Sequence, residues 1–313
     1  MKSSDPFISF VLPAYKNSFL KYAVESILNQ SYTNFELIIV NDASPYDLRS
    51  IVESFTDDRI CYFVNERNLG GKHLTDSWNH ALSYAKGEYV VLASDDDVYS
   101  PDYLYNMVEL SRKYPQVNIF HCRLRYIDVD GRFLHYSQPA LEYEKCSDFV
   151  FQRLVYGRKQ AAPEFMFKKT AIDMLGGFIN FPLGWYSDDA TWSALASKGV
   201  AYSYQPLLNF RLSGENLSSK HIGNIQKIEA LFCYERWLRQ YLSKMVPTDN
   251  DDEIIINTMK RSMHDILSGH LLSYLPYISF GYFCRVIRRA VSVGILTRRY
   301  AWGLLRKRVF SNV

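Results

Sequence analysis

The chain lacks the features that mark secreted, fibrous or membrane-spanning proteins. Its 313 residues include only five cysteines, and no two of them are close in sequence. This spacing does not support a clustered zinc site or a disulfide scaffold, so a reducing cytoplasm is the expected compartment. No apolar run approaches the roughly 20 residues that a membrane-spanning helix needs. The apolar stretch 7–12 is also too short for a signal peptide.

Acidic residues are missing from the end of the chain. From Phe280 onward there are eight Lys or Arg and no Asp or Glu, and apolar residues alternate with the basic ones. Because the whole chain carries +3, the remainder carries −5. Such a basic amphipathic segment can lie on an anionic membrane. Alternatively, these helices pack on the rest of the protein and expose their arginines to water. No accompanying motif indicates nucleic-acid binding.

The first 120 residues alternate between two apolar patterns. Four mainly apolar runs predict buried strands, at residues 7–12, 35–40, 60–64 and 89–93. Apolar residues at helical spacing predict the intervening helices, at residues 20–28, 48–55 and 74–82. Pro101 is expected to open a further helix. Repeated β–α units predict an α/β fold with a mainly parallel sheet and helices on both faces.

The pattern becomes mixed between about residues 120 and 210. Asp130-Gly131 predicts a hairpin turn, and Ser187 or Asp188 is the expected cap of a helix. Further strands are expected at residues 164–168, 202–204 and 207–211. A polar loop at 214–220 precedes helices predicted at 222–244 and 253–272, which are separated by a linker at 245–252. Two basic helical segments follow. We therefore predict a domain over 1–220 and a helical extension over 221–313.

Polar segments directly follow three of the predicted strands, at 13–15, 41–44 and 94–97. In open α/β sheets, ligands bind at the carboxyl ends of the strands. The third segment ends in Asp95-Asp96-Asp97, whose like charges repel unless a cation neutralises them. Mg²⁺ or Mn²⁺ suits such oxygen ligands and would hold nucleotide phosphates. A solvated acidic turn before the next helix is the alternative, but the position at a strand end favours the metal.

Four other features are weaker evidence for a functional site when each is taken alone. Asp42 can accept hydrogen bonds from a base or ribose, or simply shape a turn. Ala14 permits close approach of a ligand, and the Tyr15 ring can stack on a base. The glycine pair within 65–72 suits anion contact before a helix. Asp188-Asp189 can divide two tasks, one capping a helix and the other acting as a general base.

Five segments in this order resemble glycosyltransferase family 2: FVLPAYKN, ESILNQSYTNFELIIVNDAS, NLGGK with WNHAL, GEYVVLASDDD, and LGGF with YSDDATW. The resemblance covers about residues 7–213. It implies the GT-A fold, a single α/β domain that binds a nucleotide sugar, here followed by the helical extension.

The resemblance also implies roles for individual residues. The nucleotide base would be held by Pro13, Ala14, Tyr15 and Asp42. The segment that covers the base would include Gly70 and Lys72. Asp95 would contact the nucleotide, and Asp96 would be the metal ligand. Gly176-Gly177-Phe178 would lie beneath the acceptor. Of the acidic pair Asp188-Asp189, the second would be the catalytic base.

Two positions depart from the family pattern. Ser94 stands where the acidic motif often begins with Asp, and Ser213 stands where a histidine often completes the metal site. The third metal contact is therefore open.

The resulting expectation is an inverting, metal-dependent glycosyltransferase in surface polysaccharide or other glycan assembly. UDP-sugar is the favoured donor, and a glycan or lipid-linked molecule is the acceptor. The sequence identifies neither the sugar nor the acceptor. A non-catalytic nucleotide-sugar-binding protein and a nucleotidyltransferase are the alternatives, although Pro13-Ala14-Tyr15 is not the glycine-rich phosphate loop that a nucleotidyltransferase would show.

Overall fold

A computed structural model describes residues 5–71, 73–214 and 223–310. The chain divides into two compact units, the first comprising residues 1–150 and 158–220 and the second residues 151–157 and 221–313. Within the described ranges, no helix combines the length and apolar character needed to cross a membrane.

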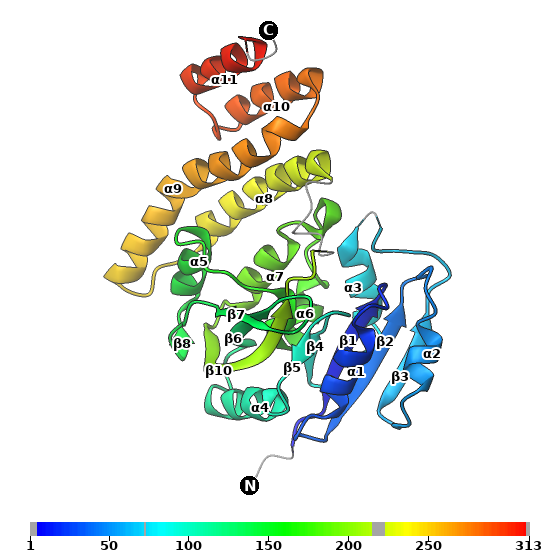
Figure 1. The fold of residues 1–313 in the computed structure, drawn as a ribbon. Helices are drawn as coiled ribbons and strands as arrows, with labels where there is room; N and C mark the ends of the chain where they lie inside the picture. Colours follow the sequence, from blue (N-terminus) through cyan, green and yellow to red (C-terminus); the bar gives the residue numbers. More distant parts are fainter. Residues whose placement is uncertain (1–4, 72, 215–222, 311–313) are drawn as a thin grey trace. The chain divides into compact units, whose positions relative to one another are not determined.

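The strands of the first unit form one sheet of ten strands within the described residues. They are β1 (Ile8–Ala14), β2 (Phe35–Asn41), β3 (Ile60–Val64), β4 (Tyr89–Leu92), β5 (Val98–Tyr99), β6 (Ile119–Ile127), β7 (Phe133–Tyr136), β8 (Tyr143–Glu144), β9 (Phe165–Lys168) and β10 (Val200–Arg211). The order along the sheet is β3-β2-β1-β4-β9-β6-β10-β5, with β7 beside β6 and β8 beside β10 (Figure 1).

The first half of this sheet confirms the predicted alternation. β1 pairs in parallel with both β2 and β4, and β2 pairs in parallel with β3. β9 runs antiparallel to its neighbours β4 and β6. The carboxyl ends of β1, β2 and β4 therefore meet at one edge, which is where the polar segments were expected.

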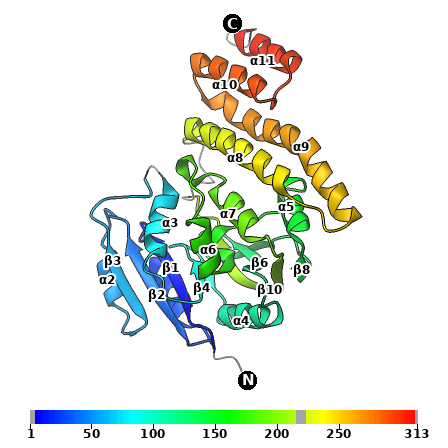
Figure 2. The ribbon, with the colours of Figure 1, turned by 180° about the vertical axis from the view of Figure 1, so that it is seen from behind.

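The helices of the first unit lie on both faces of the sheet, as Figures 1 and 2 show. They are α1 (Leu20–Leu28), α2 (Arg49–Glu53), α3 (Leu74–Leu82), α4 (Tyr103–Lys113), α5 (Cys146–Leu154, which reaches into the second unit), α6 (Lys169–Leu175) and α7 (Ser187–Leu195). On one face, alternate β1 residues, including Phe10 and Leu12, join the stripes of α1 and α4 in a fully buried core. α3 and α6 lie on the opposite face (Figure 2).

Three local expectations were wrong. The two late strands are one strand, β10, whose register shifts between Ser203 and Leu208. The helix after Pro101 begins only at Tyr103, because Asp102 is its N-terminal cap residue. Neither Ser187 nor Asp188 caps α7. Tyr186 takes that position in a left-handed conformation (φ 65°), and no side chain caps the helix.

The second unit contains helices α8 (Asn224–Lys244), α9 (Asn250–Tyr274), α10 (Phe280–Ser292) and α11 (Arg298–Phe310). α8 packs on α9, and α10 packs on α11. The predicted linker is shorter than expected, because the Asp249 side chain accepts a hydrogen bond from Asp252 N and starts α9 early. Most of the predicted polar loop, residues 215–220, lies outside the described residues.

Candidate active site

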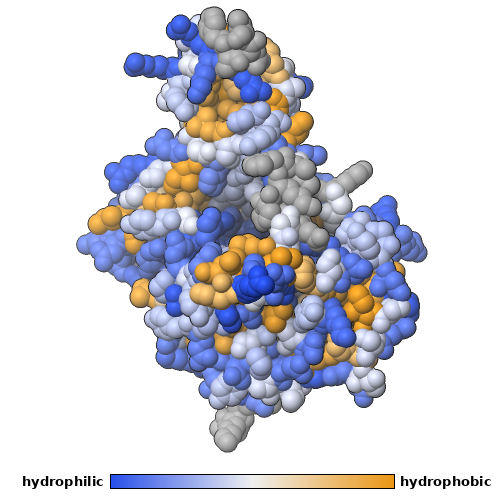
Figure 3. Space-filling view, viewed as in Figure 1, coloured by the Kyte–Doolittle hydropathy of each residue, from blue (hydrophilic) through white to orange (hydrophobic). Residues whose placement is uncertain are grey.

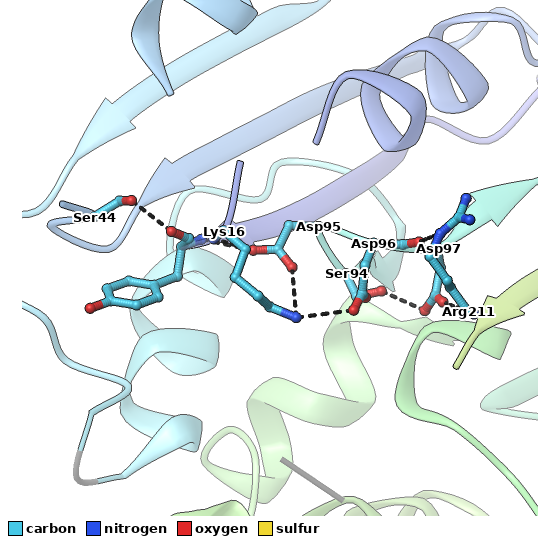
Figure 4. A network of polar contacts seen from close by, with 8 residues as sticks. Lys16, Ser44, Ser94, Asp95, Asp96, Asp97 and Arg211 are labelled. Atoms are coloured by element: carbon cyan, nitrogen blue, oxygen red, sulfur yellow. Dashed lines mark hydrogen bonds and ion pairs between the residues drawn. The ribbon is translucent and has the colours of Figure 1, made fainter. Parts of the chain in front are cut away.

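Hydrogen bonds connect the polar segment that follows β1 to the polar segment that follows β4. Asp95 follows β4, and its Oδ2 accepts hydrogen bonds from the backbone N–H groups of Tyr15 (2.9 Å) and Lys16 (2.7 Å). These bonds connect residues about 80 positions apart. They fix the backbone at Lys16 against the acidic segment, as Figure 4 shows.

Lys16 is the cation that lies between two carboxylates of the acidic segment (Figure 4). Its Nζ is 3.0 Å from Asp96 Oδ2 and 3.7 Å from Asp95 Oδ1. The two Asp side chains are 9–10% exposed, whereas the Lys16 side chain is 30% exposed. Burial raises the pKa of Asp95, and the nearby Lys16 ammonium opposes that rise. The carboxylates are therefore partly desolvated and depend on a neighbouring cation.

Asp97 points away from Lys16 and accepts a hydrogen bond from the end of β10. Its Oδ2 accepts a hydrogen bond from Ser94 Oγ at 2.5 Å, and its Oδ1 accepts one from Arg211 N at 2.8 Å. Arg211 Nε also donates to the backbone oxygen of Asp96 at 3.0 Å. Burial, together with the charge of Asp96, raises the pKa of Asp97 to about 8. Asp97 thus holds the end of β10 to the acidic segment.

Asp95 and Asp96 fit a hard divalent cation. Both supply carboxylate oxygens, the ligands that Mg²⁺ and Mn²⁺ prefer, and their oxygens already face one positive charge, the Lys16 ammonium. Among the described side chains, no three His, Cys, Asp or Glu residues converge on a single metal position. Ser213, where a third ligand was in question, is partly exposed beyond β10.

Asp42 organises the loop that leads into α3. It follows β2 and is buried. Its Oδ1 accepts from Asn65 Nδ2 (2.7 Å) and Leu69 N (2.9 Å), and its Oδ2 accepts from Gly70 N (2.8 Å). A Cβ atom at Gly70 would lie 3.0 Å from Asp42 Oδ2, so a glycine permits this close approach. Lys72 lies outside the described residues.

Tyr15 presents its ring near the same strand ends. Tyr15 is 40% exposed, and its carbonyl accepts a hydrogen bond from Ser44 Oγ at 2.6 Å. Ala43, between Asp42 and Ser44, has a left-handed backbone (φ 50°). Such strain in a non-glycine residue is concentrated at functional sites. Pro13 and Ala14, the last residues of β1, pair with the end of β2.

The acidic pair at the start of α7 has two different environments. Asp189 is 5% exposed, and its Oδ1 accepts a hydrogen bond from Gln160 Nε2 at 3.0 Å. Asp188 is partly exposed, and its Oδ1 accepts from the backbone N–H of Asp189 at 2.9 Å. The preceding turn includes two left-handed non-glycine residues, Leu183 (φ 59°) and Tyr186 (φ 65°). The backbone is therefore strained in the turn that orients Asp188 and Asp189.

The Gly176-Gly177-Phe178 segment is joined to α3. Asn79 Oδ1 accepts from Phe178 N at 2.7 Å, and a Cβ at Gly177 would lie 2.6 Å from that oxygen. Asn180 accepts from Thr75 Oγ1 and donates to Asp76 Oδ1, each at 2.7 Å. These contacts fix the segment between α6 and α7 against the beginning of α3.

Three site residues were not identified from sequence: Lys16, Gln160 and the anchoring residue Arg211. Lys16 directly follows the Pro13–Tyr15 motif, so its position was a usable signal. Gln160 lies in an irregular segment 29 residues before Asp189, and no sequence pattern connects the two. Arg211 also lines an open pocket of about 580 Å³.

The family model for glycosyl transferase family 2 matches residues 9–172. An uncharacterized glycosyltransferase of Rickettsia typhi is 25% identical over 328 residues, covering 95% of this chain and 96% of that protein. A protein of Escherichia coli named as a colanic acid biosynthesis glycosyl transferase, WcaA, is 33% identical over 140 residues, covering 44% of this chain and 48% of that protein.

Two solved structures show the same fold. TarS 1–349 of Staphylococcus aureus, in complex with UDP-GlcNAc, superposes with a TM-score of 0.67 at 16% identity, covering 91% of this chain and 81% of that one. The mannosyltransferase PcManGT of Pyrobaculum calidifontis, with GDP-Man and Mn²⁺, gives a TM-score of 0.55 at 18% identity, covering 97% and 85%. The α/β fold is thus the GT-A fold, and the chain belongs to glycosyl transferase family 2 and is a glycosyltransferase.

Proposed function

We propose that this glycosyltransferase moves a sugar from a nucleotide-diphospho-sugar to an acceptor hydroxyl with inversion and with the help of a divalent metal ion. The observation that carries the proposal is the grouping at the ends of β1 and β4. There, two carboxylates, those of Asp95 and Asp96, lie close to the Lys16 ammonium. An arrangement that binds one cation between hard oxygen ligands suits a metal–diphosphate complex.

The donor's nucleoside is assigned to the adjoining strand ends. Tyr15 offers an exposed ring for stacking, and Asp42 shapes the loop that ends at Gly70. We assign Pro13, Ala14 and the undescribed Lys72 to the same donor site on the family resemblance. UDP is the favoured nucleotide. The UDP-GlcNAc complex of TarS and the GDP-Man complex of PcManGT support a nucleotide sugar without selecting the base.

Asp96 is the proposed protein ligand of Mg²⁺ or Mn²⁺, with Asp95 beside it. When bound, the ion would neutralise the charge that grows on the leaving diphosphate. The Mn²⁺ in the PcManGT structure supports a divalent ion for this fold. Asp97 is not assigned to the metal, because its two oxygens accept from Ser94 and Arg211.

Asp189 is the proposed base. Its carboxylate takes the proton from the acceptor hydroxyl as that oxygen forms a bond to the anomeric carbon. The bond between this carbon and the diphosphate oxygen breaks on the opposite face, so the configuration inverts. Positive charge develops on the sugar ring, as in glycoside hydrolysis. Gln160 holds Asp189 Oδ1, and Asp188 holds the backbone N–H of Asp189. Both residues therefore orient the base.

The proposed setting is surface polysaccharide or other glycan assembly, at the cytoplasmic side of a membrane. The E. coli relative, named for colanic acid biosynthesis, supports this setting. We assign catalysis to residues 1–220 and treat 221–313 as a helical extension. A glycan or lipid-linked molecule would be the acceptor.

Residues 280–313 are the proposed membrane contact. On α11, Arg299, Trp302, Arg306 and Val309 follow one another at helical spacing and are all exposed. Trp302 is 65% exposed and Val309 48% exposed. Aromatic and basic side chains on one exposed face suit an anionic bilayer surface.

Sedimentation with vesicles tests this contact. The full chain should sediment with anionic vesicles and not with zwitterionic ones. A variant combining Trp302→Ala, Arg299→Ala and Arg306→Ala should lose binding, whereas Arg261→Ala, an exposed arginine of α9, should retain it. Equal sedimentation of the triple variant and the wild type would remove the membrane contact from the proposal.

A panel of UDP-, GDP- and dTDP-sugars tests the proposed donor chemistry. Calorimetric titration with and without Mn²⁺ should select one donor and show that it binds tightly only with the metal. Release of a nucleoside diphosphate from that donor would support transfer, whereas release of pyrophosphate would indicate a nucleotidyltransferase. Tight binding without turnover, even with candidate acceptors, would indicate a nucleotide-sugar-binding protein. Absence of binding across the panel would contradict the proposal.

A further inference from the structure

We propose that Lys16 is a built-in counter-ion that occupies the cation position of the acidic segment and yields it to the divalent metal when the donor binds. The ammonium then pairs with the donor diphosphate. This inference rests on the proposed metal-dependent function and adds a residue that couples metal binding to donor binding.

The backbone of Lys16 is anchored, whereas its ammonium is carried on a flexible side chain. Two backbone N–H groups, those of Tyr15 and Lys16, are anchored on Asp95 Oδ2. The Lys16 side chain, by contrast, is 30% exposed and ends in an ammonium on a flexible four-carbon stem. Its tip can therefore move while its Cα stays beside the acidic segment.

The carboxylates require a cation at this position. Asp95 and Asp96 are adjacent and 9–10% exposed, so two negative charges are partly withdrawn from water. Lys16 Nζ at 3.0 Å from Asp96 Oδ2 supplies the compensating charge. The third carboxylate, on Asp97, faces Ser94 and Arg211 instead.

A divalent ion that binds Asp96 Oδ2 would compete with Lys16 for that oxygen. In the proposed exchange, metal binding at this oxygen displaces the ammonium. A donor diphosphate beside the metal offers the displaced ammonium a new anionic partner. Each ligand would then lower the free-energy cost of binding the other, which is a reciprocal coupling.

The alternative is a static ion pair that only stabilises the turn. The displaceable counter-ion and the static ion pair predict different effects on metal binding when the ammonium is removed. A competing cation weakens metal binding in the absence of donor, so its removal strengthens that binding. A static pair away from the metal position has no such effect.

Direct measurement of Mn²⁺ binding by electron paramagnetic resonance tests the inference, with UDP as the nucleotide probe. For Lys16→Met without UDP we expect Mn²⁺ affinity about tenfold higher than in the wild type, within the usual range of coupling between sites. The affinity for UDP in the presence of Mn²⁺ should fall, and the enhancement of Mn²⁺ binding by UDP should shrink. Lys21→Met, at an exposed position of α1, is the matched control and should match the wild type.

A second variant and a second readout guard against misfolding. Lys16→Gln keeps a polar side chain and should show the same changes in smaller measure. In thermal unfolding, Mn²⁺ should raise the melting temperature of Lys16→Met more than that of the wild type, because the variant lacks its own cation.

The outcomes separate the two proposals. If Mn²⁺ binds the wild type and both Lys16 variants with equal affinity, the exchange is wrong and the metal-dependent function stands. If Mn²⁺ binds none of the proteins, with or without UDP, both the exchange and the proposed metal dependence are wrong.

Discussion

Gln160 and Asp189 are joined side chain to side chain: Gln160 Nε2 donates to Asp189 Oδ1 at 3.0 Å. A neutral amide donor fixes the orientation of a carboxylate that accepts from it. This pair connects the irregular segment before β9 to the first turn of α7. Gln160 is therefore the positioning residue of the proposed base.

Replacement of Gln160 should impair the base without removing it. For Gln160→Leu we expect kcat/KM to fall about tenfold, because a hydrogen bond to a charged group contributes roughly 1.5–3 kcal/mol. The loss should lie in kcat, whereas the KM for the donor should stay unchanged, because Gln160 orients the base and is not assigned to the donor site. Gln205→Leu, at an exposed position of β10, is the control. An unchanged kcat in Gln160→Leu would leave the residue without this role.

Replacement of Asp189 should separate binding from chemistry. Asp189→Asn should bind the donor as the wild type does, yet transfer should slow by at least about 100-fold, the usual contribution of a general base. Asp188→Asn should slow transfer less, because Asp188 acts through the backbone of Asp189. Donor titration and single-turnover kinetics measure the two effects. Wild-type turnover by Asp189→Asn would exclude it as the base.

Removal of the Asp42 carboxylate should loosen the loop that ends at Gly70. Asp42→Ala leaves the donors Asn65 Nδ2, Leu69 N and Gly70 N without their acceptor. We expect the free energy of unfolding to fall by about 1 kcal/mol, the low end of the cost of an unsatisfied donor, since the three donors lie in partly exposed residues that water can reach. Nucleotide affinity should fall too. Urea unfolding and nucleotide titration measure both effects, with the exposed Asp58→Ala as control. Wild-type stability would contradict the assigned role.

Asp97 should make stability depend on pH. Its pKa is raised to about 8 by burial and by the charge of Asp96, whereas an unfolded Asp titrates near 3.9. The folded protein therefore keeps this proton through a window in which the unfolded chain has lost it. The stabilisation is complete below about pH 4 and is lost as the pH rises toward 8. Metal-free unfolding at several pH values should show this decline in the wild type and a flatter profile in Asp97→Asn. Identical profiles would contradict the raised pKa.

The fold was largely predictable because local patterns and packing agree over the first half of the chain. The mainly apolar runs became the parallel strands β1 to β4, and the helical stripes became α1 and α3. Agreement ended at β10, because its register shift near Pro206 interrupts the apolar pattern without ending the strand. The cap of α7 was also missed, because Tyr186 adopts a left-handed backbone that no sequence signal indicates.

The site was predictable only where its residues follow strands. Asp42, Asp95 and Asp96 come directly after β2 and β4, so the sheet places them at one edge, whereas their roles stay predictions. Gln160 approaches Asp189 through tertiary packing, which a one-dimensional pattern does not contain. Lys16 was overlooked because a lone lysine in a turn is usually solvated. Only the closeness of its Nζ to Asp96 shows otherwise.

Metal-dependent release of nucleoside diphosphate tests the central claim most directly. The rate should be measured for each sugar nucleotide with Mn²⁺ and with EDTA, in the wild type, in Asp96→Asn and in the exposed control Glu53→Gln. We predict slow hydrolysis of one donor by the wild type and the control, abolished by EDTA and in Asp96→Asn. Equal release by Asp96→Asn and the wild type, or release that EDTA does not change, would contradict the proposed metal-dependent transfer.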